Sequence, residues 1–259
     1  MGMLNAPQVG ADKAPSEKTN ALVFNRTGLT YRGGVEAVRE VSLTVGHGEF
    51  VSIVGPSGCG KSSLLGIAAG LQQPTVGTVV RSDQPQYVFQ EAALMPWRSV
   101  LGNVEFMLEL RGDAKRERRE KARSIIDLVG LSGFEDAMPN QLSGGMKMRA
   151  SLARSLVCEP SVFLFDEPFG ALDDFTRERL QSELLRIKAA KPFAGLLVTH
   201  SIIEACYLAD RVVVMTGRPG HIAAEFVTGL PADRPTEVRY EQQFVDLCRM
   251  VSESLAKVS

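Results

Sequence analysis

The stretch GPSGCGKSS has the residue types and spacing of a phosphate-binding loop. Its glycines allow backbone angles that let successive N–H groups point into one concavity, and the lysine and serines that follow open a helix whose N-terminus favours anions. Lys61 can reach the β- and γ-phosphates of a nucleotide, and the Ser62 hydroxyl can bind Mg²⁺. The nucleotide-binding candidates are therefore all nine loop residues: Gly55, Pro56, Ser57, Gly58, Cys59, Gly60, Lys61, Ser62 and Ser63. A nucleoside triphosphate is the expected ligand, but kinases, GTPases, helicases and transport motors all use such loops.

Two carboxylates, Asp166 and Glu167, follow the hydrophobic run VFLF and precede a proline. An isolated Asp-Glu pair is usually a solvated loop, but a pair that ends a buried strand lies where α/β sheets bind ligands. Asp166 can hold Mg²⁺ through its water shell. Glu167 can orient or deprotonate a water molecule that attacks the γ-phosphate. The pair therefore favours hydrolysis of the triphosphate.

A third segment, LSGGM, places Ser143 at the head of a helical pattern with Gly144 and Gly145 behind it. A hydroxyl and exposed backbone N–H groups at a helix N-terminus form a second anion-binding end. An ordinary N-cap would explain an isolated Ser-Gly-Gly equally well. The carboxylate-bearing strand that follows closely favours the anion site.

The elements that must position these residues alternate between strands and helices. Strands are expected at 38–45, 50–55, 162–168, 196–200 and 211–217, with two short ones within 77–90 joined by a turn at 82–85. Helices are expected after the phosphate loop, at 111–130 and at 145–157. This alternation predicts an α/β fold with a mainly parallel sheet covered on both faces.

Composition limits the function classes. The chain has 259 residues, 44% of them hydrophobic, with a formal net charge of −1, which suits one large α/β domain and argues against a nucleic-acid partner bound by broad electrostatics. The four cysteines form no C-x-x-C pair, so we expect neither a disulfide framework nor a zinc site, and a reducing cytoplasm fits. Residues 1–20 are expected to be a disordered leader. No apolar run is long enough to span a bilayer, so another chain would supply any spans.

With these motifs, the chain resembles the ATP-binding subunits of ABC transporters from about residue 22 to residue 222. LSGGM is similar to their signature motif and VFLFDEP to their Walker B strand. Four further positions match the family in the right order: Tyr31 the aromatic that stacks on adenine, Gln90 the Q-loop glutamine, Asp173 the D-loop aspartate, and His200 the switch histidine.

The resemblance implies a P-loop NTPase fold with a small antiparallel β part and an inserted helical subdomain. We expect the ATPase domain over 21–225, its helical subdomain at about 91–141, and a C-terminal loop and one helix over 226–259. ATP and Mg²⁺ are the implied cofactors, with Glu167, His200 and Gln90 as catalytic residues and Ser62, Gln90 and Asp166 at the metal. Ser143 and Gly145 would act on ATP held by the other subunit of a head-to-tail dimer, and Gly144 and Asp173 are further implied nucleotide-binding residues.

Three kinds of ABC protein compete: transporter subunits, soluble ATPases of repair, chromosome structure or translation, and non-transport subunits. Repair and chromosome members carry a long coiled-coil insertion and translation members usually carry two ATPase modules, and neither is present here. Subunits serving cofactor assembly or cell division stay possible. The segment EAALMPWRSVLGNVEF favours a transporter, because this region of the family receives a helix of the membrane subunit. The chain looks most like the subunits of importers of nitrate, sulfonate and taurine. This resemblance implies permease subunits and an identical second ATPase subunit as direct partners, and a solute-binding protein as an indirect partner. It also implies a place on the cytoplasmic face of the membrane.

Overall fold

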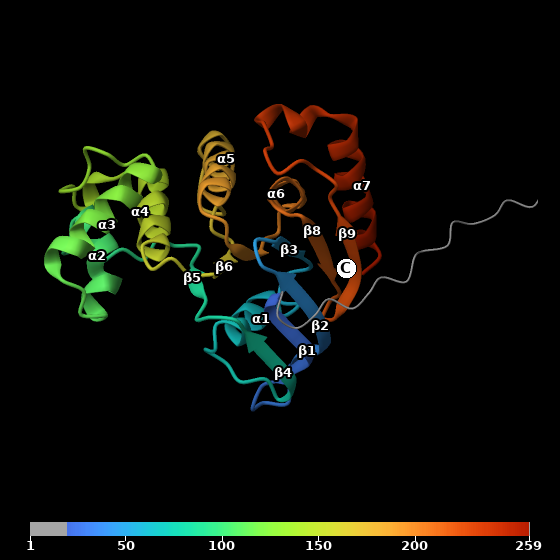
Figure 1. Cartoon of the computed structure of the whole chain (residues 1–259). Helices are drawn as coiled ribbons and strands as arrows, with labels where there is room; N and C mark the ends of the chain where they lie inside the picture. The colour runs from blue at the N-terminus through green and yellow to red at the C-terminus, as the bar shows by residue number, and fades with distance from the viewer. Residues whose placement is uncertain (1–19, 259) are drawn as a thin grey trace, which may run out of the picture.

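The computed structural model describes residues 20–258. Its central sheet has the strand order β5-β6-β7-β3-β8-β9 (Figure 1). The first five strands are parallel, and β9 runs antiparallel to β8. Their bounds are Gln86–Val88 (β5), Val162–Asp166 (β6), Ala194–Val198 (β7), Phe50–Val54 (β3), Arg211–Met215 (β8) and Ile222–Val227 (β9).

The central strands are buried on both faces, and alternate residues enter two different hydrophobic cores. In β6, Phe163 and Phe165 pack in one core while Val162 and Leu164 pack in the other. Side chains of a strand alternate between the two faces of its sheet, so a continuous apolar run such as VFLF fills both cores at once. This burial fixes the register that carries Asp166 and Glu167 to the strand end.

A second, antiparallel sheet has the order β2-β1-β4, with bounds Glu36–Gly46, Asn20–Thr30 and Val76–Arg81. Helix α1 (Lys61–Ala68) follows the phosphate loop, and its Leu64, Leu65 and Ile67 share one core with residues of both sheets. The helix is therefore held between the two sheets, with its N-terminus at the loop (Figure 1).

Three helices lie together on the side of the central sheet opposite β9: α2 (Val100–Leu110), α3 (Lys115–Leu128) and α4 (Gly144–Leu156) (Figure 1). The remaining helices are α5 (Asp174–Ala190), α6 (Ile202–Leu208) and α7 (Gln242–Ala256), with short 3-10 turns at Pro139–Gln141 and Thr236–Tyr240. No helix among residues 20–258 is both long and apolar enough to cross a bilayer.

The predicted α/β class and mainly parallel sheet are confirmed, and several local predictions need correction. The two strands expected within 77–90 exist, but β4 pairs with β1 while β5 pairs with β6, so they belong to different sheets. The helix expected over 111–130 begins at Lys115, because Gly112 takes a left-handed φ of 83° that ends α2.

The C-terminal part holds a strand that the sequence pattern did not indicate. Phe226 and Val227 were expected in a loop but end β9, whose alanine-rich run gives only a weak strand signal. Antiparallel pairing with β8 supplies the hydrogen bonds that stabilise it. The terminal helix is present as α7. The leader expected over 1–20 lies outside the described residues, apart from Asn20, which begins β1.

Candidate functional site

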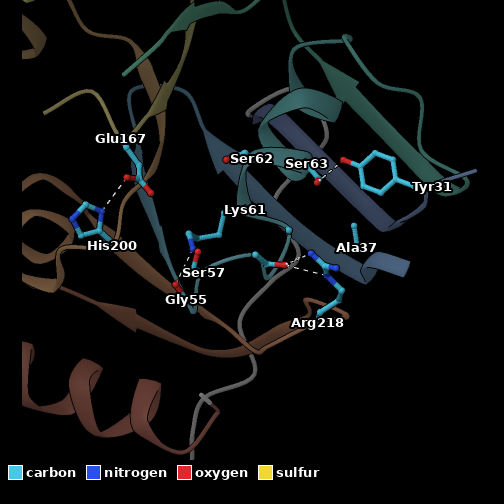
Figure 2. A pocket seen from close by; sticks show the side chains of 12 residues that line it. Tyr31, Ala37, Gly55, Ser57, Lys61, Ser62, Ser63, Glu167, His200 and Arg218 are labelled. Carbon is cyan, nitrogen blue, oxygen red and sulfur yellow. Dashed lines mark hydrogen bonds and ion pairs between the residues drawn. The ribbon is translucent and has the colours of Figure 1, made fainter. Parts of the chain in front are cut away.

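A cavity of about 510 Å³ opens where β3, β6 and β7 end. Figure 2 shows the phosphate loop on one side of it, with Glu167 and His200 at one end and Tyr31 at the other. The lining residues are Tyr31, Ala37, Gly55, Ser57, Gly58, Gly60, Lys61, Ser62, Ser63, Glu167, His200 and Arg218. Residues that the sequence assigned to the ATP site from four separate segments, namely Tyr31, the phosphate loop, Glu167 and His200, thus line one cavity.

The glycines of the loop are required by its backbone. Gly60 has a φ of 104°, and a Cβ there would lie 2.5 Å from the Ala37 carbonyl oxygen of β2. Gly58 also takes a left-handed φ, of 73°. These angles are costly for residues with a side chain, so the loop can turn tightly into α1 only with glycine. Pro56 and Cys59 belong to the same loop, with the Cys59 side chain buried beneath it.

Lys61 begins α1 and is 7% exposed. Its Nζ donates hydrogen bonds to the carbonyl oxygens of Gly55 at 2.8 Å and Pro56 at 2.9 Å. The ammonium group is thus held inside the curve of the loop, against two of its carbonyl oxygens. A fixed cation in a glycine-rich loop at a helix N-terminus is suited to the phosphates of a nucleotide.

Ser62 and Asp166 come together at the inner end of the loop. The Ser62 hydroxyl donates to Asp166 Oδ1 at 3.2 Å, although the two residues are 104 positions apart. Hydroxyl and carboxylate oxygens are the ligands that Mg²⁺ prefers, and Mg²⁺ keeps several waters and phosphate oxygens. Within residues 20–258 no group of three or more His, Cys, Asp or Glu could enclose a metal alone. The pair therefore fits a Mg²⁺ that is bound together with a nucleotide.

Tyr87 of β5 holds the other oxygen of Asp166, a contact that sequence reasoning missed. Its hydroxyl donates to Asp166 Oδ2 at 2.7 Å. Burial, followed by the hydrogen bond to this carboxylate, raises the pKa of Tyr87 above its usual value. The phenol therefore stays a neutral donor that fixes the carboxylate. Only the parallel pairing of β5 with β6 reveals this contact.

Glu167 sits just beyond β6 with a left-handed φ of 47°, an unusual angle for a residue with a side chain. Its N–H donates to the Val198 carbonyl at the end of β7, and its Oε2 lies 3.0 Å from His200 Nδ1. Strained backbone angles often occur at functional sites. Here the angle turns the carboxylate out of the sheet and toward the cavity (Figure 2).

Tyr31 lies at the far end of the cavity from Glu167. Its side chain is 43% exposed, and its hydroxyl is 2.9 Å from Ser63 Oγ. An exposed aromatic ring beside the phosphate loop can stack on a nucleobase. Arg218 and Ala37 also line the cavity but were absent from the residues expected there.

The other predicted residues lie outside this cavity. Gln90 lies against Gly170: a Cβ added to Gly170 would be 3.1 Å from Gln90 Nε2. Gln90 lines a separate cavity.

The predicted Ser-Gly-Gly segment and Asp173 lie at helix N-termini. Ser143 caps α4 by accepting the Met146 N–H, with Gly144 and Gly145 in the first turn of that helix. Asp173 caps α5, and the hydrogen bond from the Thr176 N–H lowers the pKa of its carboxyl. Ser143 and Gly145 line a cavity of about 310 Å³ with Phe134 and Phe175.

Comparison with known proteins agrees with this arrangement. Residues 38–170, which carry the phosphate loop, the Ser-Gly-Gly segment and the carboxylate pair, match the ABC transporter family. This chain belongs to the ABC transporter ATP-binding family. As an ABC cassette it is an ATPase coupled to transport.

Two named relatives and one solved structure show the extent of the similarity. An aliphatic sulfonates import ATP-binding protein of Pseudomonas syringae is 48% identical, over 78% of this chain and 84% of that protein. A nitrate import ATP-binding protein of Synechocystis is 44% identical, over 82% and 83%. A dimeric bacterial ABC transporter cassette superposes with a TM-score of 0.69 at 31% identity, covering 83% of this chain and 99% of that one.

Proposed function

We propose that this ABC cassette hydrolyses MgATP to energise the import of a small anionic solute of the nitrate or sulfonate kind. The observation that carries the ATPase chemistry is the single cavity that joins the phosphate loop to Glu167 and His200. The solute class is supported by the sulfonate and nitrate import relatives.

The residues around the cavity have different proposed roles in hydrolysis. The loop N–H groups and Lys61 bind the phosphates, and Tyr31 receives the base. Ser62 and Asp166 hold Mg²⁺, which supplies charge neutralisation on the phosphate oxygens. Glu167 accepts a proton from the attacking water, and His200, 3.0 Å from Glu167, orients the carboxylate and can donate to the γ-phosphate.

A head-to-tail dimer would complete the site. Ser143, Gly145 and Asp173 do not line the cavity of their own chain, although all three match family motifs. In a head-to-tail pair, the N-terminus of α4 of one copy faces the phosphate loop of the other. Its exposed N–H groups and Ser143 then contribute to the γ-phosphate. The dimeric cassette that resembles this chain supports the assembly.

The segment around Trp97 is the proposed docking surface for a permease subunit. Trp97 is 73% exposed beside α2, and Met95, Phe106 and Met107 line a cavity of about 290 Å³ that reaches Tyr87. An exposed aromatic next to an apolar groove suits a short helix from another chain. Because Tyr87 also holds Asp166, occupation of this groove can act on the metal site.

Tagged protein from its native host tests the proposal. After gentle membrane solubilisation, co-purification of a multi-spanning permease is expected, with a solute-binding protein encoded nearby. Trp97→Glu should no longer co-purify with the permease but should bind ATP with unchanged affinity. Tyr240→Ala is the control, because it removes another exposed aromatic residue, one that is 80% exposed. This control should keep both the permease and the affinity for ATP. Recovery only with soluble assembly or division proteins would overturn the transport role and leave the ATPase chemistry standing.

A further inference from the structure

The turn between β8 and β9 is packed directly against the phosphate loop. Val54, the last residue of β3, pairs with Val214 of β8, so the loop and the turn leave the sheet side by side. A Cβ on Gly220 would lie 2.0 Å from the Cys59 carbonyl oxygen, so only glycine permits this approach. The turn therefore lies beside the nucleotide cavity and contributes a residue to its lining.

Four backbone hydrogen bonds fix this turn in place. The Gly220 N–H donates to the Ala37 carbonyl and the Arg39 N–H donates to the Gly220 carbonyl, both on β2. The Thr216 N–H donates to His221, and the Gly217 N–H donates to Val258 beyond α7. The side chain that the turn carries is therefore presented from a rigid backbone.

That side chain is Arg218. Its Nε and Nη2 both donate to the Gly58 carbonyl oxygen, at 3.3 and 3.1 Å, and the residue lines the same cavity as Lys61 and Glu167. In the part of the chain that the structure describes, no Asp or Glu pairs with it and Nη1 has no acceptor. Figure 2 shows it beside the loop, between Ala37 and Gly55.

A guanidinium group without a carboxylate partner is suited to an anion. Arginine offers five N–H donors in a planar fork that matches phosphate oxygens, and two of its nitrogens are here used to fix the fork on the loop itself. Nη1 stays available, and the residue lines a cavity whose predicted ligand carries several negative charges. Lys61 is the other cation among the lining residues.

We infer that Arg218 is a second cationic ligand of the nucleotide phosphates, acting from the β8–β9 turn together with Lys61. The inference rests on the proposed function of the cavity. Arg218 contributes binding energy in proportion to phosphate charge, and its bonds to Gly58 keep the guanidinium in position before the nucleotide arrives.

The test measures by calorimetry the affinity of the full-length chain for adenosine, ADP and ATP in the presence of Mg²⁺. All variants also carry Glu167→Gln, so that ATP is not consumed. Arg218→Gln should weaken ATP binding roughly 5- to 20-fold and ADP binding less, while adenosine binding is unchanged. The loss should shrink at high salt, and Arg218→Lys should recover part of it. Arg116→Gln, which removes an equally charged side chain from the exposed face of α3, should change nothing.

The melting temperature of the nucleotide-free protein shows whether Arg218 binds the nucleotide or only stabilises the phosphate loop. Arg218→Gln should melt like the parent protein. An equal loss of affinity for adenosine, ADP and ATP, or a lower nucleotide-free melting temperature with no dependence on phosphate charge, would show that Arg218 only supports the loop. Unchanged ATP affinity in a parent that binds ATP would overturn this inference alone. Absence of ATP binding by the parent would overturn the proposed function instead.

Discussion

The carboxylate of Glu167 and the imidazole of His200 meet across the ends of two neighbouring strands, with Oε2 and Nδ1 3.0 Å apart. Glu167 follows β6 and His200 follows β7, and the parallel pairing of Asp166 with Val198 sets their separation. The proposed base and the group proposed to orient it thus each follow a buried strand. The arrangement is suited to activating water beside the phosphate loop.

Glu167→Gln should separate binding from turnover. The amide keeps the shape of the side chain but cannot accept a proton, so ATP hydrolysis should fall roughly 10²- to 10⁴-fold. ATP affinity measured by calorimetry should stay within about twofold of the parent, because Gln removes no phosphate ligand. Glu120→Gln, on the exposed face of α3, is the control. Normal phosphate release by Glu167→Gln would remove Glu167 from the catalytic role.

Lys61→Ala should weaken nucleotide binding itself. The variant removes the buried cation held by Gly55 and Pro56, and one charge-assisted contact of about 1.5–3 kcal/mol corresponds to roughly 10- to 100-fold in affinity for ATP. Lys191→Ala removes an exposed lysine paired with Glu159 and should bind ATP normally. Unchanged ATP affinity in Lys61→Ala would contradict the assignment of the loop.

Tyr87→Phe should act on the metal site without replacing a predicted ligand. Loss of the hydroxyl frees Asp166 Oδ2, and losing such an outer support raises the Mg²⁺ concentration needed for half-maximal hydrolysis about 10-fold. Mg²⁺ titrations of phosphate release measure this shift. Tyr31→Phe removes a hydroxyl that pairs with Ser63 and should leave the Mg²⁺ dependence unchanged. Identical Mg²⁺ curves for Tyr87→Phe and the parent would show that this hydrogen bond has no such role.

Gly220→Ala should destabilise the contact between the turn and the phosphate loop. The new methyl group would overlap the Cys59 carbonyl, and such overpacking costs about 1–3 kcal/mol of unfolding free energy. Urea denaturation should show this loss, with weaker ATP binding because the loop must shift. Gly33→Ala, where the added Cβ meets nothing within 4 Å, is the matched control. A Gly220→Ala protein as stable as Gly33→Ala would mean that the turn is free to move away.

Glu204 of α6 should make stability depend on pH. Burial raises the pKa of this carboxyl to about 7, so the folded protein holds its proton more tightly than the unfolded chain does. Stability should therefore fall as pH rises from about 4.5 to above 7, and below that window the effect vanishes. Glu204→Gln should be more stable than the parent at pH 8, by about 1–3 kcal/mol, with the difference disappearing near pH 5. Urea denaturation at several pH values measures this, and parallel pH profiles would refute it.

The sequence alone determined the groups that depend on contiguous residues. The loop GPSGCGKSS and the strand VFLFDEP each combine chemistry and local geometry in one short segment, so their residue types predict both a ligand and a place at a strand end. The alternation of strands and helices likewise predicted the parallel sheet. These signals are local because backbone conformation and burial pattern repeat over a few residues.

Only the tertiary structure decided which distant side chains join those groups. Tyr87 reaches Asp166 across 79 positions and Arg218 reaches Gly58 across 160, and neither has a distinguishing local pattern. The structure also placed Gln90 and Ser143 outside the cavity that holds Lys61 and Glu167. Such contacts follow from the order in which strands pair in the sheet, which is set by burial over the whole domain and not by any one segment.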